Sequence, residues 1–250
     1  MTSPQVPQGS ASSILGRLVG PLSVPGPVAR LPQPTMSPDR QQGFDLLERL
    51  AARHRAVGQG PNFDGVSRIV LPAGDPERFF LTQVRHPRYN PDAPSSTANC
   101  GPASLAMALL ALHRVPAGVN RQTLVMQVRQ VMTDRLDANE LTSEEDIRRG
   151  AEAAGLKARF VESLQAVEGA LQSGELVVLA GNPASYNQGM PRDQIVPFDG
   201  GHFVLVAGMQ GGRFVISDPY SMVGPLTVSR EQLAEFMAYR QWHIGVAVKP

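Results

Sequence analysis

The chain has 250 residues, of which 42% are hydrophobic and 18% charged, a balance typical of one substantial globular domain with extensions. Its 23 Lys and Arg residues nearly balance 22 Asp and Glu residues. The net charge of +1 supplies no basic field for a phosphate backbone, so we expect no nucleic acid partner. No run approaches the roughly 18 apolar residues of a membrane span, so we also expect no membrane insertion.

Residues 1–40 contain eight prolines and one acidic residue, Asp39. Such a segment cannot bury enough surface to offset the entropy of ordering. We predict a disordered leader over 1–40 and a single globular domain over 41–250. The N-terminus lacks the continuous apolar run of a secretory signal, so we expect a cytoplasmic protein. A secreted effector is the alternative, because the leader resembles the disordered secretion signals of effectors.

The first elements of the domain precede the cysteine. Residues 41–56 place Phe44, Leu47 and Leu50 at helical spacing, which predicts a short amphipathic helix. Residues 66–84 hold two apolar runs, VSRIVL and RFFLTQV, on either side of PAGDPE, and they predict two extended segments around a turn. The polar residues 86–99 are predicted to be irregular.

The remaining pattern predicts helices followed by a sheet. Helices are expected to begin at Cys100, over 120–135, over 142–156 with a Thr142–Glu145 capping box, over 163–171 and over 229–239. From residue 175 onward, five short β-branched runs predict a meandering antiparallel sheet: ELVVLAG, HFVLVAGM, GRFVISD, PLTVS and WHIGVAVK. The fold class is therefore α+β.

Cys100 is the only cysteine, so it cannot form an intramolecular disulfide. Because Cys100 lies at a predicted helix N-terminus, its thiol is near backbone N–H groups without a partner in the helix and near the positive end of the helix dipole. Both stabilise a thiolate, which is the form that acts as a nucleophile. An inert buried thiol is the alternative for a lone cysteine.

His202 and Asp218 supply the context that favours a nucleophile. His202 follows Asp-Gly-Gly and opens a predicted strand, and Asp218 closes the next strand before Pro219. Neighbouring antiparallel strands joined by a short turn bring these two ends together. A carboxylate beside the imidazole would fix its tautomer and favour imidazolium next to thiolate, which completes a Cys-His-Asp triad.

Three blocks, NCGPASLAMALL, GGHFVLVAG and GRFVISDPYS, resemble those of the bacteriocin-leader (double-glycine) peptidase family and its stand-alone papain-like relatives. The resemblance covers about residues 80–222. It implies a papain-like fold in which a helical subdomain carries Cys100 and packs on an antiparallel sheet that carries His202 and Asp218. It also implies that Cys100 is the nucleophile, His202 the general base and Asp218 the residue that orients the histidine.

The family completes its oxyanion hole with a glutamine upstream of the cysteine, and the resemblance assigns this role to Gln83. Many members place the glutamine closer to the cysteine than the 17 residues found here, so Asn99 or Asn90 is the alternative. The turn-rich segment before His202, residues 182–199, is expected to shape specificity or to be a passive insertion. The other histidines share no ligand spacing, so we predict no metal and no cofactor.

We therefore expect a cysteine peptidase that cleaves a peptide or protein substrate through an acyl-enzyme intermediate. The same triad also fits an acyltransferase, a transglutaminase or a deamidase, by resemblance to papain-like enzymes of those kinds. A catalytically weak peptide-binding module is the alternative from another class.

Overall fold

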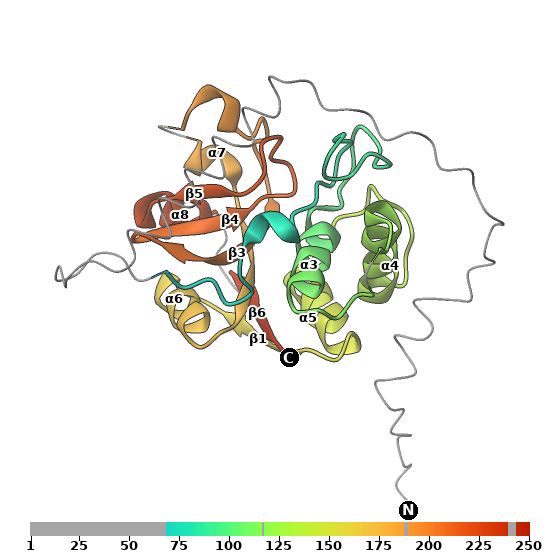
Figure 1. Ribbon diagram of the computed structural model, residues 1–250, viewed down its shortest axis with the longest axis horizontal. Coiled ribbons are helices and arrows are strands. Elements are labelled where there is room, and N and C mark those ends of the chain that lie inside the picture. The colour runs from blue at the N-terminus through green and yellow to red at the C-terminus, as the bar shows by residue number, and fades with distance from the viewer. Residues whose placement is uncertain (1–68, 117, 188–189, 240–243) are drawn as a thin grey trace, which may run out of the picture. The chain divides into compact units, whose positions relative to one another are not determined.

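The computed structural model describes residues 69–250 except 117, 188–189 and 240–243 (Figure 1). The predicted leader over 1–40, the helix over 41–56 and the boundary between leader and domain lie outside the described residues. The helices are α3 (Cys100–Ala111), α4 (Arg121–Thr133), α5 (Glu144–Ala153), α6 (Leu164–Gln172), α7 (Pro183–Tyr186) and α8 (Arg230–Met237), with 3-10 turns η1 (Pro76–Arg78) and η2 (Arg192–Gln194). The strands are β1 (Lys157–Val161), β2 (Leu176–Gly181), β3 (His202–Gln210), β4 (Arg213–Ser217), β5 (Leu226–Val228) and β6 (Gly245–Lys249).

The six strands form one sheet in the order β1-β6-β2-β3-β4-β5, and every neighbouring pair is antiparallel. The predicted meander is confirmed from β2 to β5. The last strand, β6, instead returns to lie between β1 and β2. Strand β1 was not predicted, although its residues KARFV alternate charged and apolar side chains, and the burial of these side chains alternates as in a half-buried edge strand.

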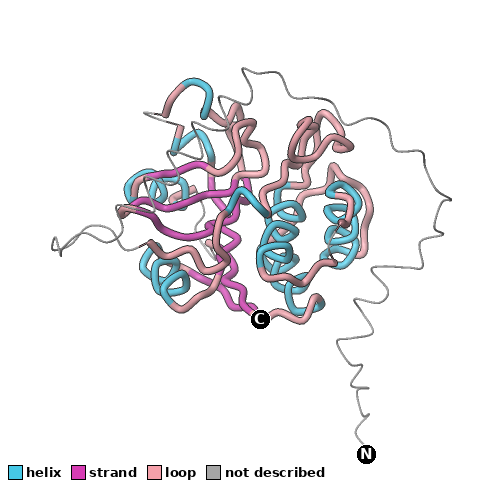
Figure 2. Tube along the Cα trace, in the orientation of Figure 1, coloured by secondary structure: helices cyan, strands magenta, loops and turns pink. Residues whose placement is uncertain are grey.

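Helices cover both faces of the sheet. In Figure 1, α3, α4 and α5 gather on one side of the strands, and α6, α7 and α8 gather on the other. Figure 2 shows the strands between these two groups of helices. Alternate residues of a strand serve the two cores, as the pleat requires. In β3, for example, Phe203 and Leu205 join the core with α3, while Val204 and Val206 join the core with α8.

The helix predicted over 142–156 is α5, but its capping box lies one residue later than predicted. Ser143 Oγ accepts a hydrogen bond from Asp146 N at 3.2 Å, and Asp146 Oδ2 accepts one from Ser143 N at 2.9 Å. The Thr142–Glu145 box is therefore wrong. The shorter aspartate fills the reciprocal position in place of glutamate. The other capping box, on Ser229 and Gln232 of α8, agrees with the predicted Ser-x-x-Gln start.

Of the first extended segment predicted over 66–84, residues 66–68 lie outside the described residues, and the second segment does not form a strand. Within the described part, Val70 alone pairs with the sheet, through hydrogen bonds of 2.7 and 2.8 Å with Met209. Gly208 permits this approach, since a Cβ there would lie 2.2 Å from Val70 O. The second run begins in η1 and continues without strand pairing, because Phe80 and Leu81 are buried in the core with α3. Their apolar character reflects burial of a loop.

Candidate active site

Cys100 is the first residue of α3, as predicted, and 9% of its surface is exposed. Eleven of the twelve residues of α3 are buried, so packing on all sides fixes the helix. The preceding residue, Asn99, makes no side-chain capping bond to the helix. Pro102 has no N–H, and Ala103 N donates to Asn99 O at 2.9 Å, so the N–H groups of Cys100 and Gly101 are the ones available to a negative charge near Cys100.

Two contacts set the position of Cys100 relative to its neighbours. Ser104, one turn further along α3, donates from Oγ to Phe203 O at 3.1 Å and so ties the helix to the residue after His202. Gly101 has a packing role, because a Cβ there would lie 2.3 Å from Thr142 Oγ1. The start of α3 is thus held between the sheet and the segment that leads into α5.

His202 and Asp218 lie together, as the strand order predicts. His202 Nε2 donates to Asp218 Oδ1 at 2.8 Å, since an ionised carboxylate can only accept. The His202 side chain is 2% exposed and that of Asp218 is fully buried. Cys100 is coupled electrostatically to the same imidazole, and each of the two groups favours the charged form of the other. Because Asp218 occupies Nε2, the nitrogen that remains for Cys100 is Nδ1.

The carboxylate of Asp218 accepts three hydrogen bonds. Besides His202, Tyr220 N donates to Oδ1 at 2.7 Å, and the hydroxyl of Tyr186 donates to Oδ2. Tyr186 is fully buried at the end of α7, where its ring lies 5.4 Å from that of Phe236. Sequence reasoning missed Tyr186. Asn182 and Pro183 signal the start of a short helix, but no local pattern shows which side chain of that helix reaches Asp218.

The electrostatics of the site favour a thiolate beside an imidazolium. Burial raises the pKa of Cys100, but the hydrogen bond and charge of His202 and the backbone hydrogen bonds with Phe203 and Gly101 outweigh it and leave that pKa below its usual value. Burial lowers the pKa of His202, but Asp218 and then Cys100 outweigh it and raise the pKa to about 10. This is the charge state in which Cys100 is nucleophilic.

Gln83 is buried between Pro219, the residue after Asp218, and Thr97, three residues before Cys100. Its backbone N–H donates to Pro219 O at 2.8 Å, next to Asp218, and its Nε2 donates to Thr97 O at 2.9 Å. Its Oε1 is buried without a hydrogen-bond partner among the described residues.

The two asparagines named as alternatives to Gln83 have other partners. Asn99 Oδ1 accepts from Arg129 Nε. Asn90 donates to Thr82 O at 2.8 Å and to Gln122 Oε1 at 3.2 Å.

Aromatic side chains border the histidine. The ring of Phe198 lies 5.6 Å from that of His202 and 5.9 Å from that of Tyr220, against which it stacks. Phe198 is 38% exposed, and it belongs to the turn-rich segment before β3. This segment therefore supplies an accessible apolar wall beside His202.

Residues 69–250, outside the gaps given above, contain no group of three or more His, Cys, Asp or Glu side chains arranged to hold a metal ion. In the same residues, no helix combines the length and the apolar character required to cross a membrane.

A helix-borne cysteine that meets a histidine–aspartate pair on an antiparallel sheet defines the class of papain-like cysteine peptidases. Within this class, the model of the Peptidase_C39 like family matches residues 80–243. The chain belongs to this family, and the resemblance stated from the three sequence blocks is confirmed. So is the predicted α+β, papain-like fold class.

Solved structures similar to this chain include three peptidases. The first, described as a C39-like peptidase from Bacillus anthracis, is 14% identical, with 73% of this chain and 98% of that one covered and a TM-score of 0.47. The second is a double glycine motif protease from an AMS/PCAT transporter in complex with the leader peptide. It is 17% identical, with 67% of this chain and 91% of that one covered and a TM-score of 0.38. The third is the peptidase domain of Streptococcus ComA. It is 19% identical, with 68% of this chain and 95% of that one covered and a TM-score of 0.40. No curated protein matches the chain.

Proposed function

We propose that the chain is a cysteine peptidase that hydrolyses peptide bonds with Cys100 as nucleophile, His202 as general base and acid, and Asp218 as the residue that orients His202. The observation that carries the proposal is the 2.8 Å hydrogen bond between His202 and Asp218, with Cys100 at the start of α3 coupled electrostatically to the same imidazole, in a member of a peptidase family. The Cys100 thiolate attacks the substrate carbonyl, and His202 protonates the leaving amine. Water then hydrolyses the acyl-enzyme.

Two groups stabilise the oxyanion in this proposal. The first is the backbone N–H of Cys100, which lies in the first turn of α3 and has no partner within the helix. The second is the Nε2 group of Gln83. An amide nitrogen carries two hydrogens, and the bond to Thr97 O uses one of them, so one remains for the substrate. Replacing Gln83 by alanine then lowers kcat about 10²-fold or more.

The test is incubation of the purified protein with a proteome-derived peptide library, followed by mass spectrometry. The proposal predicts shorter peptides with new termini from the wild-type protein and none from Cys100→Ala. Ser173→Ala is a matched control, since Ser173 ends α6 away from the triad.

Three outcomes would overturn peptide hydrolysis. Products heavier by about 1 Da indicate deamidation, and products with an added amine indicate acyl transfer. Bound peptides that are recovered intact, with Cys100 accessible to alkylation, indicate a peptide-binding module. Equal cleavage by Cys100→Ala would remove Cys100 from the reaction altogether.

A further inference from the structure

Arg129 on α4 is a fully buried cation. Its Nε donates to Asn99 Oδ1, and its Nη2 donates to Ala98 O at 3.1 Å and to Glu140 O at 2.9 Å. All three acceptors are neutral amide or carbonyl oxygens. Its Nη1 is also buried and has no hydrogen-bond partner among the described residues. The guanidinium is thus removed from water without a hydrogen-bonded carboxylate.

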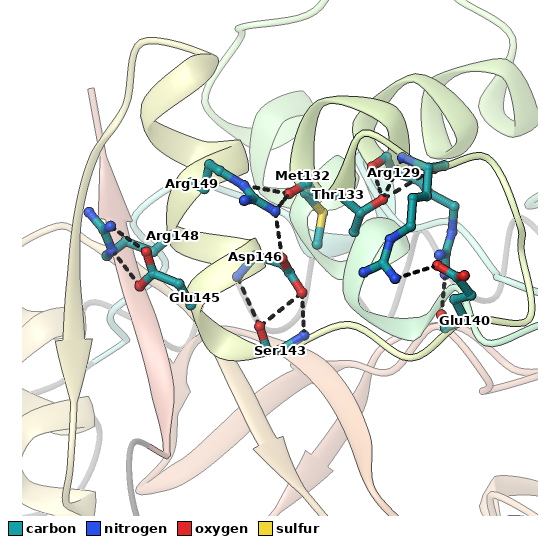
Figure 3. A network of polar contacts seen from close by, with 10 residues as sticks. Arg129, Met132, Thr133, Glu140, Ser143, Glu145, Asp146, Arg148 and Arg149 are labelled. Atoms are coloured by element: carbon teal, nitrogen blue, oxygen red, sulfur yellow. Dashed lines mark hydrogen bonds and ion pairs between the residues drawn. The ribbon is translucent and has the colours of Figure 1, made fainter.

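The arginines of the adjacent helix are different. Figure 3 shows Arg148 and Arg149 on α5 bound to acidic side chains of their own helix. Arg148 pairs with Glu145 and Glu152, and Arg149 pairs with Asp146 at 2.7 Å. These pairs are part-exposed. A buried guanidinium without a bound carboxylate, by contrast, loses its hydration with no compensating ion pair, which costs folding free energy. The buried position of Arg129 therefore calls for another negative group that its charge can stabilise.

That group is adjacent to the residue that Arg129 holds. Asn99 immediately precedes Cys100, and its side-chain oxygen is directed to Arg129 instead of capping α3. Burial lowers the pKa of Arg129. Among the negative charges that raise this pKa, Cys100 has the largest effect, followed by Glu140 and Asp137. Electrostatic coupling is mutual, so a cation that is favoured by a thiolate also favours that thiolate.

We propose that Arg129 is a positioning residue, whose buried guanidinium fixes Asn99 at the start of α3 and stabilises the thiolate of Cys100 from the side opposite the histidine's strand. The inference rests on the proposed function only in taking Cys100 as the nucleophile. Apart from burial, which raises it, the pKa of Cys100 is set mainly by His202, Phe203 and Gly101, which lower it, so the contribution of Arg129 is a smaller addition to theirs.

The charged and titratable groups around this arrangement come from several elements. They are His202 on β3, Asp218 and Tyr186 behind it, Arg129 on α4, and Arg135, Asp137 and Glu140 in the segment between α4 and α5.

The experiment uses the fact that Cys100 is the only cysteine of the chain. The rate of alkylation by iodoacetamide, measured against pH on the full protein, reports the pKa of this one thiol. Arg129→Met is expected to raise the midpoint by about one pH unit, the order of effect that one nearby charge has at an effective dielectric constant of about 20. Arg129→Lys is expected to restore most of the difference.

Arg149→Met is the matched control. Arg149 also donates to a main-chain carbonyl, that of Met132 on α4. Its loss therefore disturbs the packing of α4 and α5 but removes no charge beside Asn99. An unchanged midpoint in folded Arg129→Met, or an equal rise in Arg149→Met, would overturn the inference. If Arg129→Met does not fold, Arg129→Gln and Arg129→Lys are compared instead, and equal midpoints in these two overturn it.

Alkylation requires no substrate, so this test is separate from that of the proposed function. A protein that cleaves no peptide but shows the predicted midpoints keeps the inference. An active peptidase whose midpoint does not depend on Arg129 overturns the inference alone.

Discussion

Replacing Tyr186 by phenylalanine removes a single oxygen from the site. The hydroxyl is one of three donors to Asp218, and it is the only one of the three that serves Oδ2. The burial of Tyr186 and the charge of Asp218 raise the pKa of Tyr186 well above its usual value, so the hydroxyl remains a donor at every working pH. A hydrogen bond to a charged group contributes about 1.5 to 3 kcal/mol, so we expect Tyr186→Phe to lose about 2 kcal/mol of unfolding free energy.

Tyr89 is a matched control within the same chain. Its hydroxyl donates to Glu77 Oε1 at 2.7 Å, but Glu77 is part-exposed and also pairs with Arg88 at 2.6 Å. Tyr89→Phe is therefore expected to lose less than about 1 kcal/mol. Urea unfolding of both variants measures the difference. Equal losses, or a Tyr186→Phe protein as stable as the wild type, would refute the argument that burial makes the Tyr186 bond strong.

Further variants test charge and packing around Cys100. In Cys100→Ala the contribution of Cys100 is lost, but Asp218 still raises the pKa of His202 against the effect of burial, so the folded state keeps a proton that the unfolded state loses near the usual histidine pKa of about 6.5. The contribution of protonated His202 to the free energy of unfolding is then complete below about pH 6.5 and decreases as the pH rises toward the folded-state pKa of His202. If urea unfolding at several pH values shows a free energy of unfolding that increases over this range, the ion pair of His202 with Asp218 is contradicted. Gly101→Ala places a Cβ 2.3 Å from Thr142 Oγ1, so it should cost about 1 to 3 kcal/mol in thermal or urea unfolding. The double variant Gly101→Ala with Thr142→Ala should recover part of that cost, and strict additivity of the two changes would argue against the contact.

The positions of Cys100, His202 and Asp218 were predictable because each lies at an end of an element whose interior has a strong pattern. A helix-forming apolar run follows Cys100, and nearly continuous apolar strands follow His202 and precede Asp218. The strand turn then brings His202 and Asp218 together. Chemistry placed at the ends of regular elements is therefore accessible to local reasoning.

The parts that sequence reasoning missed depend on contacts between distant segments. Tyr186 reaches Asp218 because α7 is held on α8, where Gln232 Nε2 donates to Tyr186 O at 2.9 Å. Strand β1 is only five residues long, so its alternation is a weak local signal, and its pairing with β6 specifies it. The run 78–84 resembled a strand because a buried loop and a buried strand require the same apolar side chains. No local window contains this information.

The place of β6 in the sheet affects how the chain can fold during its synthesis. Strand β6 pairs with β1 and with β2, and it lies more than 60 residues after both. Until residues 245–249 leave the ribosome, β1 has no strand beside it and one edge of β2 is open. Val246 and Val248 also complete the core that contains Cys100. A nascent chain can therefore carry Cys100, His202 and Asp218 while the layer that supports the cysteine helix is still unfinished, so these residues reach their final arrangement only after residues 245–249 have emerged.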